Sequence, residues 1–509
     1  MGTGRTEFEL KFVGAPGDIA KLPNSDFFRA VAPKGSWEKL SSTYYDTSDG
    51  SLADAGLSLR LREEGAKLVQ AVKARGDNAV TRAEYERELE SDRDFPKKTG
   101  DAKIDEFIKT HRSAIEPIAR IAVDRWSANI TFKGTEIELA VDVGRAESWG
   151  EAGKRLTCPI AEVELELLDG SPADVFGFAR LLIANAKLRM GAGTKLDTAM
   201  ALRRPAAELL PPQKISVTPD TIAVDALTML LDTTGTRLAS LQRNVVEYRL
   251  PEGIHQMRVA LRRLRAVERV YRPYLKSKKI KKLAQRAKFY AGILGSARDW
   301  DVLLGETIPS TQSSDYAPSG IRALKANAEA ERAIAWGVVI EAIDHPDFTE
   351  FLLGVTEACV VTSWSNASRK PMRQPIKTFA PEILDHALGR VLGLSQTLDG
   401  SEALSARHPM RIALKKLRYP VQLFRSAYPK SERKDYMRGL SMLQDAFGTI
   451  NDAVVAQSLV DIAAANAGDD AIRAAGFIAG YKAAEAKIAA QQIDKAWAAF
   501  SEQRPFWRE

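Results

Sequence analysis

The stretch Glu7-Phe8-Glu9-Leu10-Lys11-Phe12 alternates charged and apolar residues, which predicts a β-strand with one ionisable face and one apolar face. The same two-residue period returns in later segments, the clearest being Leu59-Arg60-Leu61-Arg62, Arg82-Ala83-Glu84-Tyr85-Glu86, 136–143 and 162–167. Because all these segments carry both faces, we expect the first half of the chain to be mainly β.

A proline-rich stretch from Pro205 to Asp220 ends this pattern, since proline interrupts both helices and strand ladders. Beyond it, apolar residues recur at spacings of three and four, and Ala and Leu are frequent, so helices are expected. The predicted organisation is a multidomain α+β protein, with a β domain at 1–204, a linker at 205–220 and an all-α domain at 221–509.

The composition is that of an ordinary globular protein, with 45% hydrophobic and 27% charged residues and a net charge of +7. The two cysteines, Cys158 and Cys359, lie far apart and lack the spacing of a disulfide framework or a zinc site. No apolar stretch reaches the ~18 residues that can span a membrane. These features predict a reducing, cytoplasmic setting without a membrane partner.

The second half repeats itself at a fixed offset. The segment from His255 to Arg265 matches the segment from His408 to Arg418 at each basic and apolar position, and 408 − 255 gives an offset of 153 residues. Downstream, 295–299 and 448–452 match at the same offset. We therefore expect an internal duplication, with repeats at about 221–360 and 377–509.

Each repeat places a histidine and three basic residues on one helical stripe, because their spacings are three and four. The stripes consist of His255, Arg258, Arg262 and Arg265 in the first copy, and His408, Arg411, Lys415 and Arg418 in the second. Neighbouring cations suit an extended phosphate chain such as polyphosphate or nucleic acid. The alternatives are a solvent-exposed face for the stripes, and a helix-capping role for His255 after the Pro251-Glu252-Gly253 break.

These repeats resemble the CHAD family, the conserved-histidine α-helical domains, from about Thr221 onward. The resemblance implies a two-fold pseudo-symmetric helical bundle that binds inorganic polyphosphate through the eight stripe residues. Arg298 and Asp299 correspond to an Arg-Asp element of the family, whereas the second copy has Asn451 and Asp452 there, and Val454 in place of Asp301. Nucleic acid is a weaker candidate partner, because no aromatic residues interleave with the stripes.

The β half resembles the CYTH family, also called triphosphate tunnel metalloenzymes, across about residues 1–204. The resemblance rests on the Glu7-x-Glu9-x-Lys11 strand and on the basic and acidic residues that follow it in order, which are Arg60, Arg62, Lys73, Arg125, Glu162 and Glu164. It implies an eight-stranded antiparallel β-tunnel with flanking helices. It also implies further phosphate contacts near Lys187 and Lys195.

A closed barrel with polar side chains inside would place acids and bases on facing walls. The bases Arg60, Arg62, Lys73 and Arg125 can then bind phosphate oxygens, and the acids Glu7, Glu9, Glu162 and Glu164 can hold Mg²⁺ or Mn²⁺. Lys11 can clamp a phosphate or serve as a base, and we favour the clamp. Four more acids face the polar side of their strands, namely Glu84, Glu86, Glu138 and Asp142. The alternative is an open sheet whose polar face meets water.

Together these features predict a metal-dependent hydrolase that converts inorganic triphosphate to pyrophosphate and phosphate, with Glu7, Glu9 and Lys11 as its catalytic residues. The resemblance also permits a class IV-type adenylate cyclase or a nucleoside or thiamine triphosphatase. A non-enzymatic protein that binds polyphosphate, with targeting to polyphosphate granules, is the remaining alternative. Fusion to a helical domain of the polyphosphate-binding kind favours inorganic triphosphate as the substrate.

Overall fold

The computed structural model describes residues 5–64, 67–76, 78, 80–91, 95–150, 153–204, 217–275, 277–312, 319–361, 370–395, 403–465 and 467–508. For Arg5 and for residues 403–408 it describes the backbone alone. The chain forms two compact units. One contains 1–211, 235–248 and 344–362, and the other contains 212–234, 249–343 and 363–509.

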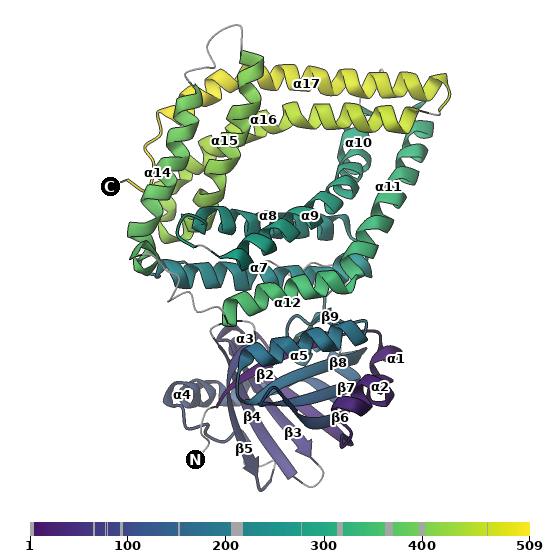
Figure 1. The fold of residues 1–509 in the computed structure, drawn as a ribbon, viewed down its shortest axis with the longest axis vertical. Coiled ribbons are helices and arrows are strands. Elements are labelled where there is room, and N and C mark those ends of the chain that lie inside the picture. Colours follow the sequence, from purple (N-terminus) through teal and green to yellow (C-terminus); the bar gives the residue numbers. More distant parts are fainter. Residues whose placement is uncertain are drawn as a thin grey trace. The chain divides into compact units, whose positions relative to one another are not determined.

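The first unit is built on a closed antiparallel barrel of eight strands, which confirms the predicted fold (Figure 1). The strands follow the order β5-β4-β3-β2-β6-β7-β8-β1, and β1 pairs with β5 to close the barrel. Their bounds are β1 Arg5–Val13, β2 Ser36–Thr47, β3 Leu57–Glu64, β4 Lys67–Arg75, β5 Thr81–Leu89, β6 Ile115–Phe132, β7 Thr135–Trp149 and β8 Arg155–Asp169. A short strand, β9 (Arg189–Met190), adds to β1.

The alternation in β1 separates the interior of the barrel from its outer packing. Phe8, Leu10 and Phe12 are buried, and Phe8 meets Phe176 of α5 (Pro172–Asn185) edge to face at 5.8 Å. Since successive side chains of a strand point to opposite faces, Glu7, Glu9 and Lys11 point the other way. Apolar packing outside the barrel therefore directs the charged residues inward.

Short helices flank the strands, as predicted. They are α1 Pro16–Ile19, α2 Asp26–Val31, α3 Ser51–Asp54, α4 Ala102–His111 and α6 Lys195–Ala201. The helix α2 covers one side of the barrel, where Phe28 packs against Trp126 with ring centroids 5.5 Å apart. A capping box between Thr194 and Asp197 fixes the start of α6 at Lys195.

The barrel unit also holds two segments from the helical half of the sequence. They are residues 235–248, in and just beyond the second half of α7 (Ala223–Val246), and 344–362, which contain α12 (Pro346–Val360). Thr349 of α12 is fully buried and donates a hydrogen bond to the carbonyl oxygen of Leu188 at 2.8 Å. The predicted division at 205–220 does not anticipate this packing, and residues 205–216 of that linker lie outside the described residues.

The second unit is helical, as predicted for the second half. Its elements are α8 Pro251–Tyr271, α9 Lys278–Val302, a π-helical turn Leu303–Thr307, α10 Ile308–Gln312, α11 Ile321–Asp344, α14 Ile376–Ser395, α15 Ala403–Phe424, α16 Lys430–Ala464 and α17 Asp469–Ser501. The matching sequence motifs fall on matching elements, with the stripes on α8 and α15 and the downstream motifs on α9 and α16. Two-fold symmetry itself stays a prediction.

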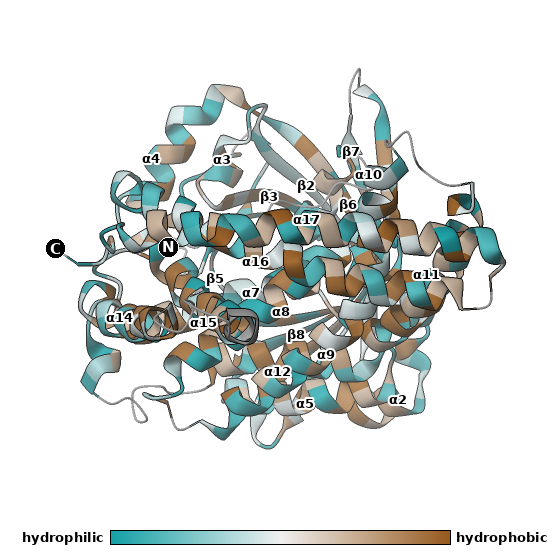
Figure 2. Cartoon of the chain, turned by 90° about the horizontal axis from the view of Figure 1, so that it is seen from above, coloured by the Kyte–Doolittle hydropathy of each residue, from teal (hydrophilic) through white to brown (hydrophobic). Residues whose placement is uncertain are grey.

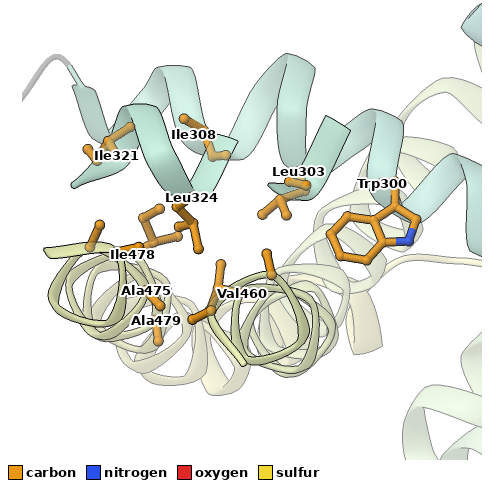
Figure 3. Packing of buried hydrophobic residues seen from close by; sticks show 14 residues of the cluster. Trp300, Leu303, Ile308, Ile321, Leu324, Val460, Ala475, Ile478 and Ala479 are labelled. Atoms are coloured by element: carbon orange, nitrogen blue, oxygen red, sulfur yellow. The ribbon is translucent and has the colours of Figure 1, made fainter. Parts of the chain in front are cut away.

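Apolar faces hold this unit together. Figure 3 shows Trp300, Leu303 and Leu324 packed against side chains of α16 and α17 such as Val460 and Ile478. Hydrophobic and hydrophilic residues alternate along α16 and α17 (Figure 2), because one face of each helix is buried and the other meets water. No helix among the described parts of the chain is both long and apolar enough to cross a membrane.

Candidate functional site

Acids and bases interleave inside the barrel, as the alternating strands predict. The Nζ atom of Lys11 lies 3.1 Å from an oxygen of Glu162 and 3.7 Å from one of Glu164. Glu7 receives a hydrogen bond from Lys73 at 2.8 Å. Adjacent strands therefore bring these predicted site residues into one network.

Arg125 and Lys195 form the most enclosed part of the network. Arg125 on β6 binds Asp142 on β7 with two hydrogen bonds of 2.7 and 2.6 Å, and binds Glu164 at 2.6 Å. Lys195 reaches in from the start of α6, 2.8 Å from Asp142 and 3.0 Å from Glu162, and also pairs with Glu164. These two cations are thus held by three carboxylates.

Burial makes the charges of this group strongly interdependent. Burial alone would raise the pKa of Glu164, but Lys195, Arg125 and Lys11 hold that pKa well below its usual range. The pKa of Asp142 is also lowered, because the effect of Lys195 and Arg125 outweighs that of burial. The pKa values of Lys195 and Arg125 are raised well above their usual range by these carboxylates, against the effect of burial. Glu164, Asp142, Lys195 and Arg125 are therefore charged at neutral pH.

A second group of cations lies on β3 and β4 and pairs mainly with acids of β5. Arg60 is 3.6 Å from Glu84 and 3.3 Å from Glu86, and Lys73 is 3.1 Å from Glu84. Arg62 pairs with Glu86 at 3.4 Å and also with Glu64. The pKa values of Arg60 and Lys73 are raised, because nearby acidic groups outweigh burial. The barrel thus carries cations on opposite parts of its wall.

A row of acids crosses three neighbouring strands. Glu9 on β1 pairs in register with Glu166 on β8, and Glu166 pairs in register with Glu138 on β7. Burial, followed by Glu7, Glu138 and Glu9, raises the pKa of Glu166 to about 7. Burial is also the main cause of the raised pKa values of Glu9 and Glu138. The row therefore carries more negative charge than the neighbouring cations can neutralise.

These carboxylates have the chemistry that a hard divalent cation needs, because Mg²⁺ and Mn²⁺ prefer oxygen ligands. Among the described residues, however, no three acid, His or Cys side chains already converge on one point. Of the predicted metal ligands, Glu162 and Glu164 pair with Lys11 and Lys195, and Glu7 pairs with Lys73. The row around Glu9 therefore offers the better fit for a cation.

Lys187 lies apart from the other predicted substrate-binding residues. Its side chain is 67% exposed and its Nζ atom pairs with Asp344 at 2.6 Å. Conversely, sequence analysis did not assign a role to Glu166, although it continues the alternation of Glu162 and Glu164 and so shares their face. Gly191 was also missed, because no sequence period marks it.

Gly191 makes room for the side chain of Lys11. A Cβ atom at position 191 would lie 2.6 Å from Cγ of Lys11, which is closer than real side chains approach. The backbone N–H of Gly191 also donates to the carbonyl oxygen of Lys11 at 2.8 Å. Gly191 is thus a positioning residue for Lys11.

In the helical unit, the two basic stripes influence one another. Burial lowers the pKa of Lys415 on α15, and Arg411 and Arg262 lower it further. Burial also lowers the pKa of Arg418, and Arg262 on α8 lowers it further. The stripes of the two repeats therefore lie close enough to interact electrostatically.

The head of the first stripe is also crowded with cations. Burial lowers the pKa values of His255 and Arg258, and Arg298 and Arg262 add to the effect in both. Arg265 follows one turn after Arg262 on α8. The side chain of His408 lies outside the described residues. Cations that lower one another's pKa values repel each other, and a bound anion relieves this repulsion. The arrangement therefore favours anion binding.

Family models match both halves of the chain. The CYTH domain model matches residues 5–199 and the CHAD domain model matches residues 234–461. The chain combines a CYTH domain with a CHAD domain. The CYTH match covers the closed barrel and α5, and the CHAD match covers both basic stripes. The CHAD match also includes the two segments that pack with the CYTH barrel, 235–248 and 344–362.

Solved structures resemble each domain. The CHAD domain from the plant Ricinus communis is 24% identical over 58% of this chain and 97% of that chain, with a TM-score of 0.49. PptA from Streptomyces chartreusis is 15% identical over 55% of this chain and all of that chain, with a TM-score of 0.43. The putative adenylyl cyclase HpAC1 from Hippeastrum, described as having a dominant triphosphatase activity, is 17% identical over 41% of this chain and 98% of that chain, with a TM-score of 0.25.

Proposed function

We propose that the CYTH domain hydrolyses inorganic triphosphate to pyrophosphate and phosphate, with Mg²⁺ or Mn²⁺ as the cofactor. The observation that supports this most is the interleaving of acids and bases inside a closed barrel. A site that bound anions alone would not place carboxylates beside each cation. Metal-dependent hydrolysis of a phosphoric anhydride needs bases to bind the anionic substrate and carboxylates to bind the metal cation.

The ion pairs inside the barrel are the contacts that the substrate replaces when it binds. Arg60, Arg62 and Lys73 on one part of the wall, and Arg125 and Lys195 on another, exchange their carboxylate partners for phosphate oxygens. Lys11, which pairs with Glu162 and Glu164, clamps a phosphoryl oxygen by the same exchange. The exchange preserves charge balance, since each cation keeps an anionic partner.

The exchange also frees Glu7 from Lys73, and Glu7 then joins the row of acids around Glu9 as a site for a cation. Glu9, Glu138 and Glu166 would hold Mg²⁺ or Mn²⁺ together with Glu7, and bound metal would neutralise the phosphate charge and orient water. Glu7 and Glu9 remain the residues whose loss should most reduce activity. Enclosure by the barrel strengthens these electrostatic contacts by keeping bulk water out.

The CHAD domain is proposed to bind inorganic polyphosphate along the stripes of α8 and α15. The cations of the two stripes repel one another, so an extended polyanion that contacts several of them stabilises all of them at once. These cations are Arg258, Arg262, Lys415 and Arg418. A cytoplasmic setting and association with polyphosphate granules are part of this proposal. Binding of nucleic acid is the competing outcome.

A product analysis with several substrates tests the enzymatic proposal. The full chain is incubated with triphosphate, ATP or long-chain polyphosphate, with Mg²⁺, Mn²⁺ or a chelator, and the products are separated by ion chromatography. We expect metal-dependent conversion of triphosphate to pyrophosphate and phosphate. Cyclic AMP and pyrophosphate from ATP would instead show a cyclase, and binding without any product would show a polyphosphate-binding protein.

A further inference from the structure

A narrow cavity opens beside the acids of the barrel and is closed by helices from the other half of the sequence. On the barrel side it is lined by Glu7, Glu9 and Lys11 of β1, by Arg82 of β5 and by the turn at 190–193. On the opposite side it is lined by α7 and α12, through Gly235, Thr236, Ala239, Leu352 and Thr356. All these residues belong to the barrel unit.

The cavity lies where β1 changes its neighbour. The pairing of β1 with β5 ends at Phe8, and its pairing with β9 begins at Phe12. Glu9 and Lys11 stand at the junction of the two pairings, where the N–H of Glu9 donates to the carbonyl oxygen of Val80 and the carbonyl oxygen of Lys11 accepts from the N–H of Gly191. Residues of α7 and α12 line the cavity at this junction.

Several contacts hold the two helices at the barrel. Besides the hydrogen bond from Thr349 to Leu188, Arg180 of α5 pairs with Glu357 of α12 at 2.7 Å. Arg189 of β9 pairs with Glu247, just beyond α7, also at 2.7 Å. A Cβ atom at Gly235 would lie 3.1 Å from Cγ1 of Val355, so α7 and α12 pack closely here. The helices thus form a fixed wall.

We propose that α7 and α12 form the end wall of the phosphate site and set the length of phosphate chain that the barrel accepts. This inference rests on the proposed function. The helices contribute one glycine, one alanine, one leucine and two threonines to the lining of the cavity, and its cations, Lys11 and Arg82, come from the barrel. The Thr356 hydroxyl donates to the carbonyl oxygen of Leu352 at 3.2 Å, so among its described lining residues the wall offers no positive charge that could neutralise a further phosphoryl group.

The size of the cavity leads to the same conclusion. Its volume is about 60 Å³, room for a few water molecules, whereas pockets for drug-sized ligands begin near ~300 Å³. A further phosphoryl group would be pressed against Leu352 with the acids Glu7 and Glu9 opposite. Burial of such unbalanced charge is strongly unfavourable. A phosphate chain therefore ends at this wall and does not pass through it.

Two variants of the full chain change the wall in opposite directions. Leu352→Ala widens the cavity and Ala239→Leu narrows it, while Ala184→Leu makes the same exchange at an exposed position of α5 as a control. The measurement is the ratio of kcat/KM for tetraphosphate to kcat/KM for triphosphate. Because both values come from one preparation, a partly unfolded variant does not change the ratio.

We expect Leu352→Ala to raise this ratio about tenfold and Ala239→Leu to lower it by a similar factor. A tenfold change is at the low end of the discrimination that a small change in pocket size produces between substrates. The control should leave it unchanged. Equal ratios in all three variants and the parent chain would show that α7 and α12 merely brace the barrel. If the parent chain hydrolyses neither substrate, the proposed function fails. The wall is then tested by the ratio of the two dissociation constants in calorimetry, with the same expected directions.

Discussion

Neighbouring acids on one strand differ in charge state because their surroundings differ. Glu164 lies among Lys195, Arg125 and Lys11, which keep its pKa low. Glu166 is two residues further along β8 and meets Glu7, Glu9 and Glu138, so its pKa rises to about 7. Two residues on the same face of one strand thus differ because cations surround Glu164, whereas mainly other acids surround Glu166.

Replacing Glu166 by Gln should change how stability depends on pH. In the unfolded chain this carboxyl loses its proton near pH 4.5, whereas in the folded chain it does so at about 7, so its ionisation destabilises the fold as pH rises between these values. In urea unfolding of the full chain without divalent cations, Glu166→Gln should match the parent at pH 4.5. At pH 8 it should be more stable by about 1 to 2 kcal/mol, allowing for screening by water. Equal stability at both pH values would contradict the proposed crowding of acids.

Gly191 should be needed for the correct position of Lys11. In Gly191→Ala the new Cβ atom would displace the Lys11 side chain from Glu162 and Glu164, so kcat/KM for triphosphate should fall about tenfold. Gly17→Ala, where a Cβ atom would meet no atom within 4 Å, is the matched control. An unchanged kcat/KM in Gly191→Ala would mean that the position of Lys11 is unimportant for the reaction.

At this scale the sequence predicts residues on regular strands better than residues beyond them. The alternation in β1 places Glu7, Glu9 and Lys11 on one face, and the packing of Phe8 against Phe176 confirms which face is outside. Lys187 and Lys195 follow the last long strand, where the period of two no longer applies. Tertiary packing alone decides that Lys195 enters the barrel while Lys187 is exposed.

The elements of the helical unit explain why its two basic stripes act together. Helices α8 and α15 carry Arg262 and Lys415, and Arg262 lowers the pKa of Lys415. Each stripe could be identified from spacings of three and four in the sequence. Their proximity could not, because the motifs are 153 residues apart and only the fold brings the helices together.

Removing one cation from each stripe should weaken polyphosphate binding in a salt-dependent way. In the variant Arg262→Ala, Lys415→Ala, the plot of log affinity against log salt concentration should become shallower by about 1 to 2, since two fewer phosphates are neutralised. Arg322→Ala, Lys487→Ala removes two exposed cations of α11 and α17 as a control. An equal slope in the two double variants would place the polyphosphate site elsewhere, and stronger competition by RNA than by polyphosphate would favour nucleic acid.

On the scale of the whole molecule, the sequence boundary and the structural boundary differ. The sequence predicts a division at the proline-rich stretch 205–220, whereas in the structure 235–248 and 344–362 belong to the barrel unit. Contacts such as the one from Thr349 to Leu188 join residues 161 positions apart, which no local pattern reveals. The CYTH barrel should therefore be studied within the full chain, where α7 and α12 complete its wall.

The most direct test of the catalytic barrel is phosphate release from triphosphate by the full chain and by Glu7→Gln, Glu9→Gln. Glu88→Gln, an exposed position of β5, is the matched control. We predict that the parent chain and the control release phosphate only with Mg²⁺ or Mn²⁺, and that the double variant is at least about a hundredfold slower although it remains folded. Equal release by the double variant and the parent chain would contradict the assignment of the reaction to the acids of the barrel.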